Sequence, residues 1–309
     1  MLRKPQIGNS FRSTLRVQFG MHAMKIGFVT DSPSDLPADL AEQYGVEVIP
    51  AVLVIEGREY RDNLDLSREE FYRRLPGLRQ PPSTAAPSPL DFSTRYGKLL
   101  TAGCEHVISL HISEKLTSIP NFARTAARDF PDRVTVIETG SLSLGSGFQV
   151  LAAAEAAEDG ADLPAVLEVI RSTRERIRVG AALDTMDYLR RSGRVPAAVT
   201  AIGGLLSIKP VVELREGVVK PLSAARTTRH ATQALFNFLL TLGPLERLAV
   251  MHTNAEPRAR EFLELLMSSE VRKVIPREIR TVNVTSLIGT HIGPNGLGFA
   301  AVKVENSGH

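Results

Sequence analysis

The chain is poor in the residues that build covalent or metal-based frameworks. Its 309 residues include one cysteine and no tryptophan. The lone cysteine, Cys104, excludes an internal disulfide and a cysteine-based zinc cluster. It also fits a reducing compartment, so we expect a cytoplasmic protein. No clustered carboxylates stand out in the sequence, and we expect neither a metal nor another cofactor.

Long apolar runs and blocks of like charge are also missing. The longest nearly apolar stretch, residues 195–208, is about six residues short of the roughly 20 that a membrane span needs. Lysine and arginine are spread along the chain and the formal net charge is only +3, so nothing favours a nucleic-acid partner. Residues 1–24 are basic, lack the apolar core of a secretory signal, and are expected to form a disordered leader.

Standard nucleotide-binding and hydrolase motifs are absent from the sequence. No G-K-S/T, G-x-S-x-G or H-E-x-x-H segment occurs. The glycines of THIGPNGLG follow the order G-x-x-G-x-G, whereas dinucleotide folds use G-x-G-x-x-G before a helix. We therefore interpret this segment as a tight turn that carries His291, and not as a phosphate loop.

An alternation of strand-like and helix-like segments is what the sequence does contain. KIGFVTDS reads as a buried strand, and SDLPADLAEQYG as a helix that Asp35 caps and Pro37 begins. VEVIPAVLVIEG is the next apolar run. This order predicts an α/β domain with a parallel sheet over residues 25–160. Over residues 161–309 the pattern becomes α+β, with a hairpin turn at Glu216-Gly217.

Hydroxyl side chains follow two of the predicted strands, where open α/β sheets bind ligands. Thr84 lies in the proline-rich loop PPSTAAPSP, in which Ser88 is explained as a helix N-cap and Thr84 is not. Thr117 and Ser118 precede a helix that begins near Pro120. These two hydroxyls either cap that helix or share an incoming carboxylate or phosphate with its N–H groups.

Cationic side chains and one histidine complete the candidates. Arg194 follows Gly193, where the backbone can turn sharply. Arg226 precedes a predicted helix, and a cation there opposes the helix dipole by up to about 1 kcal/mol unless an anion binds. His291 by itself is more often explained as a structural histidine than as a ligand-binding one.

Taken in order, these segments resemble the DegV family of bacterial lipid-binding proteins from about Lys25 to Glu305. Each segment alone is weak, but the ordered series is specific. The resemblance implies a DegV-like fold, with an N-terminal α/β domain, a C-terminal α+β domain and the ligand between them. The segments are TDSPSDLP, STAAPSPLDF, ISEKLTSIPNFA, IETGSLSLGSG, MDYLRRSGRV, GGLLSIKPVVELREG and HIGPNGLG.

The same resemblance implies a function without catalysis. Members bind one long-chain fatty acid in a buried tunnel, and some present its carboxylate to a partner fatty acid kinase for acyl phosphorylation. Carried over to this sequence, the carboxylate site comprises Thr84, Thr117, Ser118, His291 and Arg194.

Arg226 would face the kinase. The head-group loops also depart from the family pattern, because Ser118–Asn121 replace Gly-Thr-Tyr-Gln and Ala85–Ala86 replace Ser-Gln. These loops therefore carry fewer hydroxyl and amide groups than those of the family.

Two other functional classes are consistent with the residues. The first is an enzyme acting on a small anionic substrate, with His291 as acid–base and Arg194 as anion clamp. The second is a regulatory or structural protein with an unrelated partner. The fatty acid hypothesis is physically sound, because burying about 14 methylene groups at about 0.8 kcal/mol each provides roughly 11 kcal/mol before the cost of immobilisation.

Overall fold

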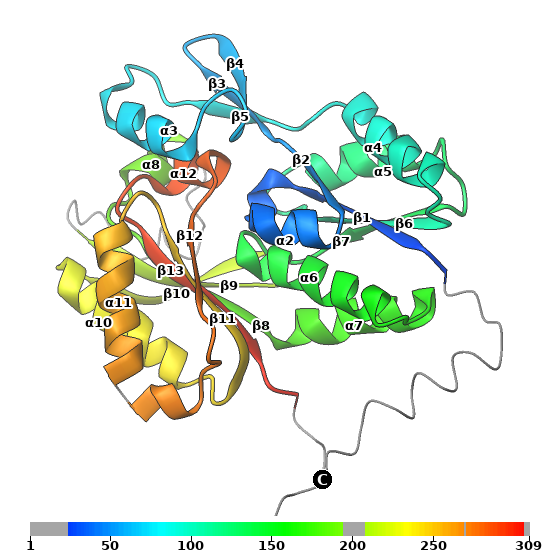
Figure 1. Ribbon diagram of the computed structural model, residues 1–309. Coiled ribbons are helices and arrows are strands. Elements are labelled where there is room, and N and C mark those ends of the chain that lie inside the picture. Colours follow the sequence, from blue (N-terminus) through cyan, green and yellow to red (C-terminus); the bar gives the residue numbers. More distant parts are fainter. Residues whose placement is uncertain (1–23, 194–207, 269, 306–309) are drawn as a thin grey trace, which may run out of the picture.

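Three sheets organise the chain in the computed structural model, which describes residues 24–193, 208–268 and 270–305 (Figure 1). Within this part of the chain the strand orders are β2-β1-β6-β7, β10-β9-β8-β13-β11-β12 and β4-β3-β5. The predicted α/β class with a parallel sheet and a second, mixed sheet is confirmed.

The first sheet is parallel and is covered by helices on both faces. Its strands are β1 (Ile26–Asp31), β2 (Val46–Ile49), β6 (His106–His111) and β7 (Val134–Glu138). Phe28 packs with α2 (Ala38–Gln43), α6 (Leu144–Glu158) and α7 (Leu163–Arg176), whereas Val29 packs with α4 (Pro89–Thr101) and α5 (Ile119–Ala127). Because successive side chains point to opposite faces, a strand buried on both sides must be apolar throughout.

The second sheet packs one face against helices of its own and the other against α6. Phe236 of α10 and Phe262 of α11 cover one face, while Phe148 of α6 packs on Val179 and Met251 of the other. Helix α6 therefore lies between the two large sheets and joins their cores (Figure 1). The elements are β8 (Ile177–Ala182), β9 (Lys209–Arg215), β10 (Val218–Ala225), β11 (Leu245–His252), β12 (Arg280–Asn283), β13 (Leu297–Lys303), α10 (Thr228–Leu240), α11 (Glu256–Ser268) and the 3₁₀ turn η3 (Glu270–Lys273).

A third, small sheet was not expected from the sequence. The apolar run at residues 46–57 contributes β2 to the first sheet and β3 (Val52–Ile55) to the third, where β3 pairs with β4 (Arg58–Arg61) and β5 (Ser83–Ala85). The break falls at Pro50, which has no N–H to donate to a continuing ladder. Helix α3 (Arg68–Arg74) and the 3₁₀ turn η2 (Leu75–Gly77) follow β4, and α8 (Asp187–Arg191) and α12 (Ser286–Ile292) pack nearby.

Two local predictions were wrong. Asp35 does not cap α2, whose N-cap is Pro37; it follows the 3₁₀ turn η1 (Ser32–Ser34), is buried, and accepts a hydrogen bond from the backbone N–H of Thr285. His291 lies in the last turn of α12 and not in the tight turn after it. The run TSLIGTHI is short and rich in β-branched residues, so its sequence does not predict a helix. The helix is stabilised by packing against the third sheet and α8.

Other local predictions are confirmed. Ser88 and Asp91 form a reciprocal capping box at the start of α4. Glu216 and Gly217 form the β9–β10 turn, both with positive φ. The turn after α12 forms as expected, and it includes Asn295 with a left-handed φ of 61°, which asparagine tolerates. Apart from Met24, the predicted leader lies outside the described residues, and so does Arg194.

Candidate binding cavity

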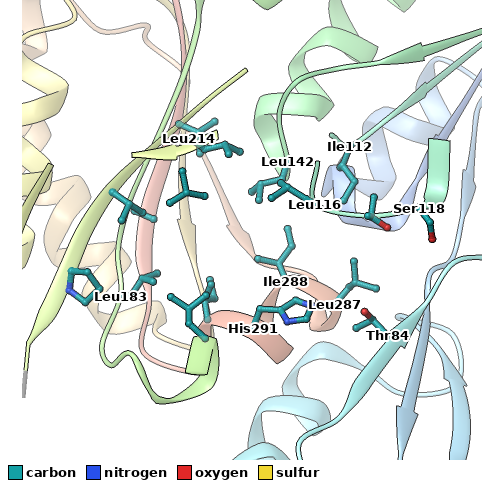
Figure 2. Close-up of a pocket in the computed structure, with 18 of the residues that line it drawn as sticks. Thr84, Ile112, Leu116, Ser118, Leu142, Leu183, Leu214, Leu287, Ile288 and His291 are labelled. Carbon is teal, nitrogen blue, oxygen red and sulfur yellow. The ribbon is translucent and has the colours of Figure 1, made fainter. Parts of the chain in front are cut away.

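An elongated apolar cavity lies where the three sheets approach one another. Among the described residues, sixteen of the twenty that line it are apolar, and the other four are Thr84, Thr117, Ser118 and His291. The apolar walls come from β8, β9, β10, α12 and the loops after β6 and β7. Figure 2 shows Thr84 and Ser118 on one side and Leu183 and Leu214 on the other, with His291 between them, next to Thr84. The cavity therefore has a polar end and a long apolar body.

Thr84 reaches the cavity because it belongs to a strand and not to the predicted loop. In β5 it pairs with Leu53 of β3 and is half-buried, while its neighbours Ser83 and Ala85 are exposed. This alternation is the two-residue period of a strand, and it turns the Thr84 hydroxyl inward. Proline residues on both sides stop the strand after three residues.

Thr117 and Ser118 lie on the loop that enters α5. The N–H of Thr117 donates to the carbonyl oxygen of Ser113, and the Thr117 hydroxyl accepts a long bond of 3.4 Å from the N–H of Ile119. Ser118 is the N-cap residue, but its side chain does not cap the helix and is exposed. Pro120 occupies the first turn and has no N–H to offer. The hydroxyls are thus only weakly used by the helix.

Helix α12 brings His291 to the polar end of the cavity. Leu287, Ile288 and Ile292 from the same helix line the apolar body, so one short helix contributes to both parts. The helix lies against α3, where a Cβ at Gly289 would come within 2.4 Å of the Tyr72 hydroxyl. Only glycine permits this close approach, which fixes how far His291 projects.

The β9–β10 hairpin forms a wall of the cavity and is anchored at its tip. Leu214 and Val219 face the cavity, and between them the N–H of Gly217 donates to the carbonyl oxygen of Gly140 at 2.7 Å. Lys115 donates through Nζ to the carbonyl oxygen of Glu216 at 2.8 Å. Because Lys115 is on the loop of Thr117 and Ser118, the wall and the hydroxyl-bearing loop are held together.

A buried chain of side chains lies behind this loop. Asp31 Oδ2 accepts from the N–H of Ile112 at 3.1 Å and lies 3.0 Å from Nδ1 of His111, whose Nε2 lies 2.7 Å from Oγ of Ser109. The residue types are those of a serine hydrolase triad. All three residues have 0% exposure, so no substrate can reach them, and they brace the loop instead.

Neither a metal site nor a membrane span is found in the part of the chain that the structure describes. No group of three or more histidine, cysteine, aspartate or glutamate side chains there could hold a metal ion. No described helix is both long and apolar enough to cross a membrane.

Four of the five predicted carboxylate ligands are thus brought to one cavity, although they are far apart in sequence. The fifth, Arg194, lies outside the described residues. Arg226 does not line the cavity and is exposed at the turn between β10 and α10. Sequence reasoning missed the apolar lining and the anchored hairpin. The alternating apolar residues of β9 were a sequence signal for the cavity wall. Nothing in the sequence around Gly140 and Gly217 predicts the hydrogen bond between them.

Fold and cavity together define an α/β protein with an apolar cavity that has a few polar residues on one side. The chain belongs to the DegV family: the model of this family, described as uncharacterised, matches residues 25–304. A DegV domain-containing protein of Caldanaerobacter subterraneus subsp. tengcongensis is 34% identical over 279 residues, which are 89% of this chain and 97% of that protein.

Solved structures show the same similarity. A DegV family protein from Thermus thermophilus, described by its fatty acid binding, has 33% identity and a TM-score of 0.84, covering 91% of this chain and 100% of the other. DegV from Bacillus subtilis, described as a fatty acid binding protein, has 27% identity and a TM-score of 0.80, with 91% and 100% covered.

Proposed function

We propose that this protein binds a long-chain fatty acid in the cavity, with the carboxylate at the end formed by Thr84, Thr117, Ser118 and His291. The observation that carries the proposal is the division of the lining into sixteen apolar and four polar residues, with Thr84 and Ser118 on one side and His291 next to Thr84. A molecule with one polar end and a long apolar tail matches this division. The fatty acid binding of the Thermus thermophilus and Bacillus subtilis relatives supports it.

The energetics favour a ligand that is retained. Burying the tail contributes about 0.8 kcal/mol per methylene, while an unpaired buried carboxylate would cost several kcal/mol. Hydroxyl and imidazole groups at one end offset that cost by hydrogen bonding. Tight retention argues for transfer of the bound acid to a partner. We therefore also propose that the carboxylate is presented to a fatty acid kinase, with the exposed Arg226 on the contact surface, and that this occurs in the cytoplasm.

An enzyme that turns over a small anion is the alternative. Sixteen of the twenty lining residues are apolar and offer no partner to a small anion, and the two relatives are described by the fatty acid that they bind.

Native mass spectrometry of the purified protein tests the proposal. We expect an added mass equal to one long-chain fatty acid, lost on delipidation and restored by palmitic acid. A delipidated protein that takes up no palmitic acid would refute the proposal.

A further inference from the structure

The motif TDSPSDLP places Asp35 in a buried ionic cluster outside the cavity. Asp35, Asp62 and Arg68 meet where three chain segments converge, each leading from a different sheet: η1 after β1, the loop after β4, and the link from β12 to α12. Asp35 and Asp62 are each 2% exposed. Nη1 of Arg68 lies 2.8 Å from Oδ1 of Asp35. The fatty acid proposal leaves this cluster without a role.

Both carboxylates hold the residues that start α12. Oδ1 of Asp35 accepts from the N–H of Thr285 at 2.9 Å. Oδ2 of Asp62 accepts from the hydroxyl of Thr285 at 2.7 Å, and its Oδ1 accepts from the N–H of Ser286 at 3.3 Å. Arg68 also donates to the carbonyl oxygen of Asn283 at 2.5 Å. These four bonds therefore hold Asn283, Thr285 and Ser286, the residues just before and at the start of the helix.

The position of the helix start decides where His291 lies. Six residues separate Thr285 from His291, about 9 Å along a helix, and a helix this short moves as a rigid unit. Its other contacts hold its sides, because α12 packs on α3, α8 and the third sheet. The Tyr72 hydroxyl also donates to the carbonyl oxygen of Val284 just before the helix. The carboxylates add the bonds to Thr285 and Ser286 that hold the helix start itself.

The cluster carries more negative than positive charge. Two buried carboxylates share one guanidinium. Burial is the largest influence on the pKa of Asp35, and it raises that pKa. Such an arrangement costs folding free energy, because buried charges are stabilised less than in water. Neutral side chains would hold a purely structural junction equally well. A charged cluster that fixes the orientation of a binding group can offset its cost in folding free energy by improving binding.

We propose that Asp35 is a positioning residue of the head-group site: through Thr285, together with Asp62, it orients α12 so that His291 faces the carboxylate of the bound acid. The inference rests on the fatty acid function proposed above. It assigns a function to the aspartate of the D-L-P segment, which touches neither the cavity nor the ligand.

Removal of the Asp35 side chain tests the proposal. Asp35 has a left-handed φ of 53°, so Asp35→Gly removes the carboxylate without adding backbone strain. Asp35→Asn retains an oxygen for the Thr285 N–H and tolerates the same φ. Asp132→Gly is the matched control, because Asp132 is exposed and has a φ of 61°.

Equilibrium dialysis of the delipidated full chain would compare palmitic acid with hexadecan-1-ol, which has the same tail without the carboxylate. We expect Asp35→Gly to weaken palmitic acid by about tenfold and to leave hexadecanol within about twofold, as for the loss of one charge-assisted hydrogen bond. Asp35→Asn should restore palmitic acid binding, and Asp132→Gly should match the wild type.

Three results separate the possible failures. Equal weakening of both ligands, or unchanged palmitic acid binding by Asp35→Gly, overturns the positioning role. If Asp35→Gly does not fold, Thr285→Val serves. It removes the hydroxyl that donates to Asp62 and accepts from the N–H of Leu287 as the N-cap of α12. The same selective loss is expected, and an unselective result overturns the role. Absence of palmitic acid binding by the wild type would instead refute the fatty acid function itself.

Discussion

Gly217, at the tip of the β9–β10 hairpin, donates its N–H to the carbonyl oxygen of Gly140 at 2.7 Å. Gly217 belongs to the second sheet, and Gly140 lies in the loop after β7 of the first sheet. Their hydrogen bond therefore joins the hairpin wall of the cavity to the first sheet. Glu216 beside it pairs with Arg174 of α7 at 2.9 Å. The hairpin is therefore fixed at its tip and not only along its strands.

Gly217→Ala should release this hairpin tip. Gly217 has a φ of 69°, and a Cβ there would come within 2.2 Å of Oγ of Ser113. We expect a loss of about 2 kcal/mol or more in the free energy of unfolding and weaker retention of palmitic acid. Denaturant titration and equilibrium dialysis measure the two effects.

Gly243→Ala is the control for Gly217→Ala, since its φ is 76° with no atom within 4 Å of the added Cβ. It should cost only the strain of the left-handed backbone, about 1 kcal/mol, and leave binding intact. Equal effects of the two substitutions would show that contact with Ser113 is unimportant.

Removing the two threonine hydroxyls should weaken acid binding selectively. Thr84→Val with Thr117→Val preserves volume and deletes two donors to a carboxylate, each worth about 1.5 to 3 kcal/mol. Palmitic acid affinity should then fall about 100-fold or more. Thr125→Val on the exposed side of α5 is the matched control. A change below about threefold for the double variant would place the carboxylate elsewhere.

Gly289→Ala and Gly97→Ala should have opposite effects on stability. At Gly289 a Cβ meets the Tyr72 hydroxyl, which donates to the carbonyl oxygen of Val284 at 2.9 Å, so α12 must shift at a cost of about 1 to 3 kcal/mol. At Gly97 in α4 the space is open, and alanine should stabilise the helix by up to about 1 kcal/mol. Thermal unfolding distinguishes the signs. Stabilisation by both substitutions would contradict the tight packing of α12 on α3.

Stability should depend on pH through Asp35. Burial, more than any other influence, raises the pKa of this carboxyl from 3.8 to about 6, although Arg68 opposes the rise and Asp62 reinforces it. The folded state then binds more protons than the unfolded state between these values, so the free energy of unfolding rises as pH falls through 6.

From pH 7 to 5, the wild type should therefore gain roughly 1 kcal/mol relative to Asp35→Asn, which lacks the titrating group. Urea titrations at both pH values measure the difference. A wild type that loses stability relative to Asp35→Asn over this range would show that the carboxyl is stabilised in its ionised form.

Charge reversal at Arg226 tests the proposed kinase surface. Arg226→Glu should leave palmitic acid binding unchanged and lower kinase-dependent acyl phosphate formation at least tenfold, because like charges at a complementary interface repel. Arg229→Glu, on the exposed first turn of α10, is the neighbouring control. If the fatty acid bound to each variant is phosphorylated as in the wild type, the partner surface lies elsewhere.

The sequence alone determined the elements whose signals are local. Ser88 and Asp91 cap α4 through bonds within one turn. The hairpin bends at Glu216-Gly217, where both residues have positive φ and Gly217 adopts it without steric cost. The apolar strands of the first sheet also follow from local pattern, since both their faces are covered.

Only the tertiary structure decided the cavity and what positions it. Thr84 was assigned to a loop because three residues between prolines carry no strand signal, and pairing with β3 made them a strand. His291 was assigned to a turn because α12 is stabilised by α3, α8 and buried carboxylates, not by its own propensity. Asp35 reads locally as a helix cap, and its actual partners, Arg68, Ser143 and Thr285, lie 33, 108 and 250 residues away. Contacts over such separations leave no periodicity in the sequence, so folding alone brings these groups together.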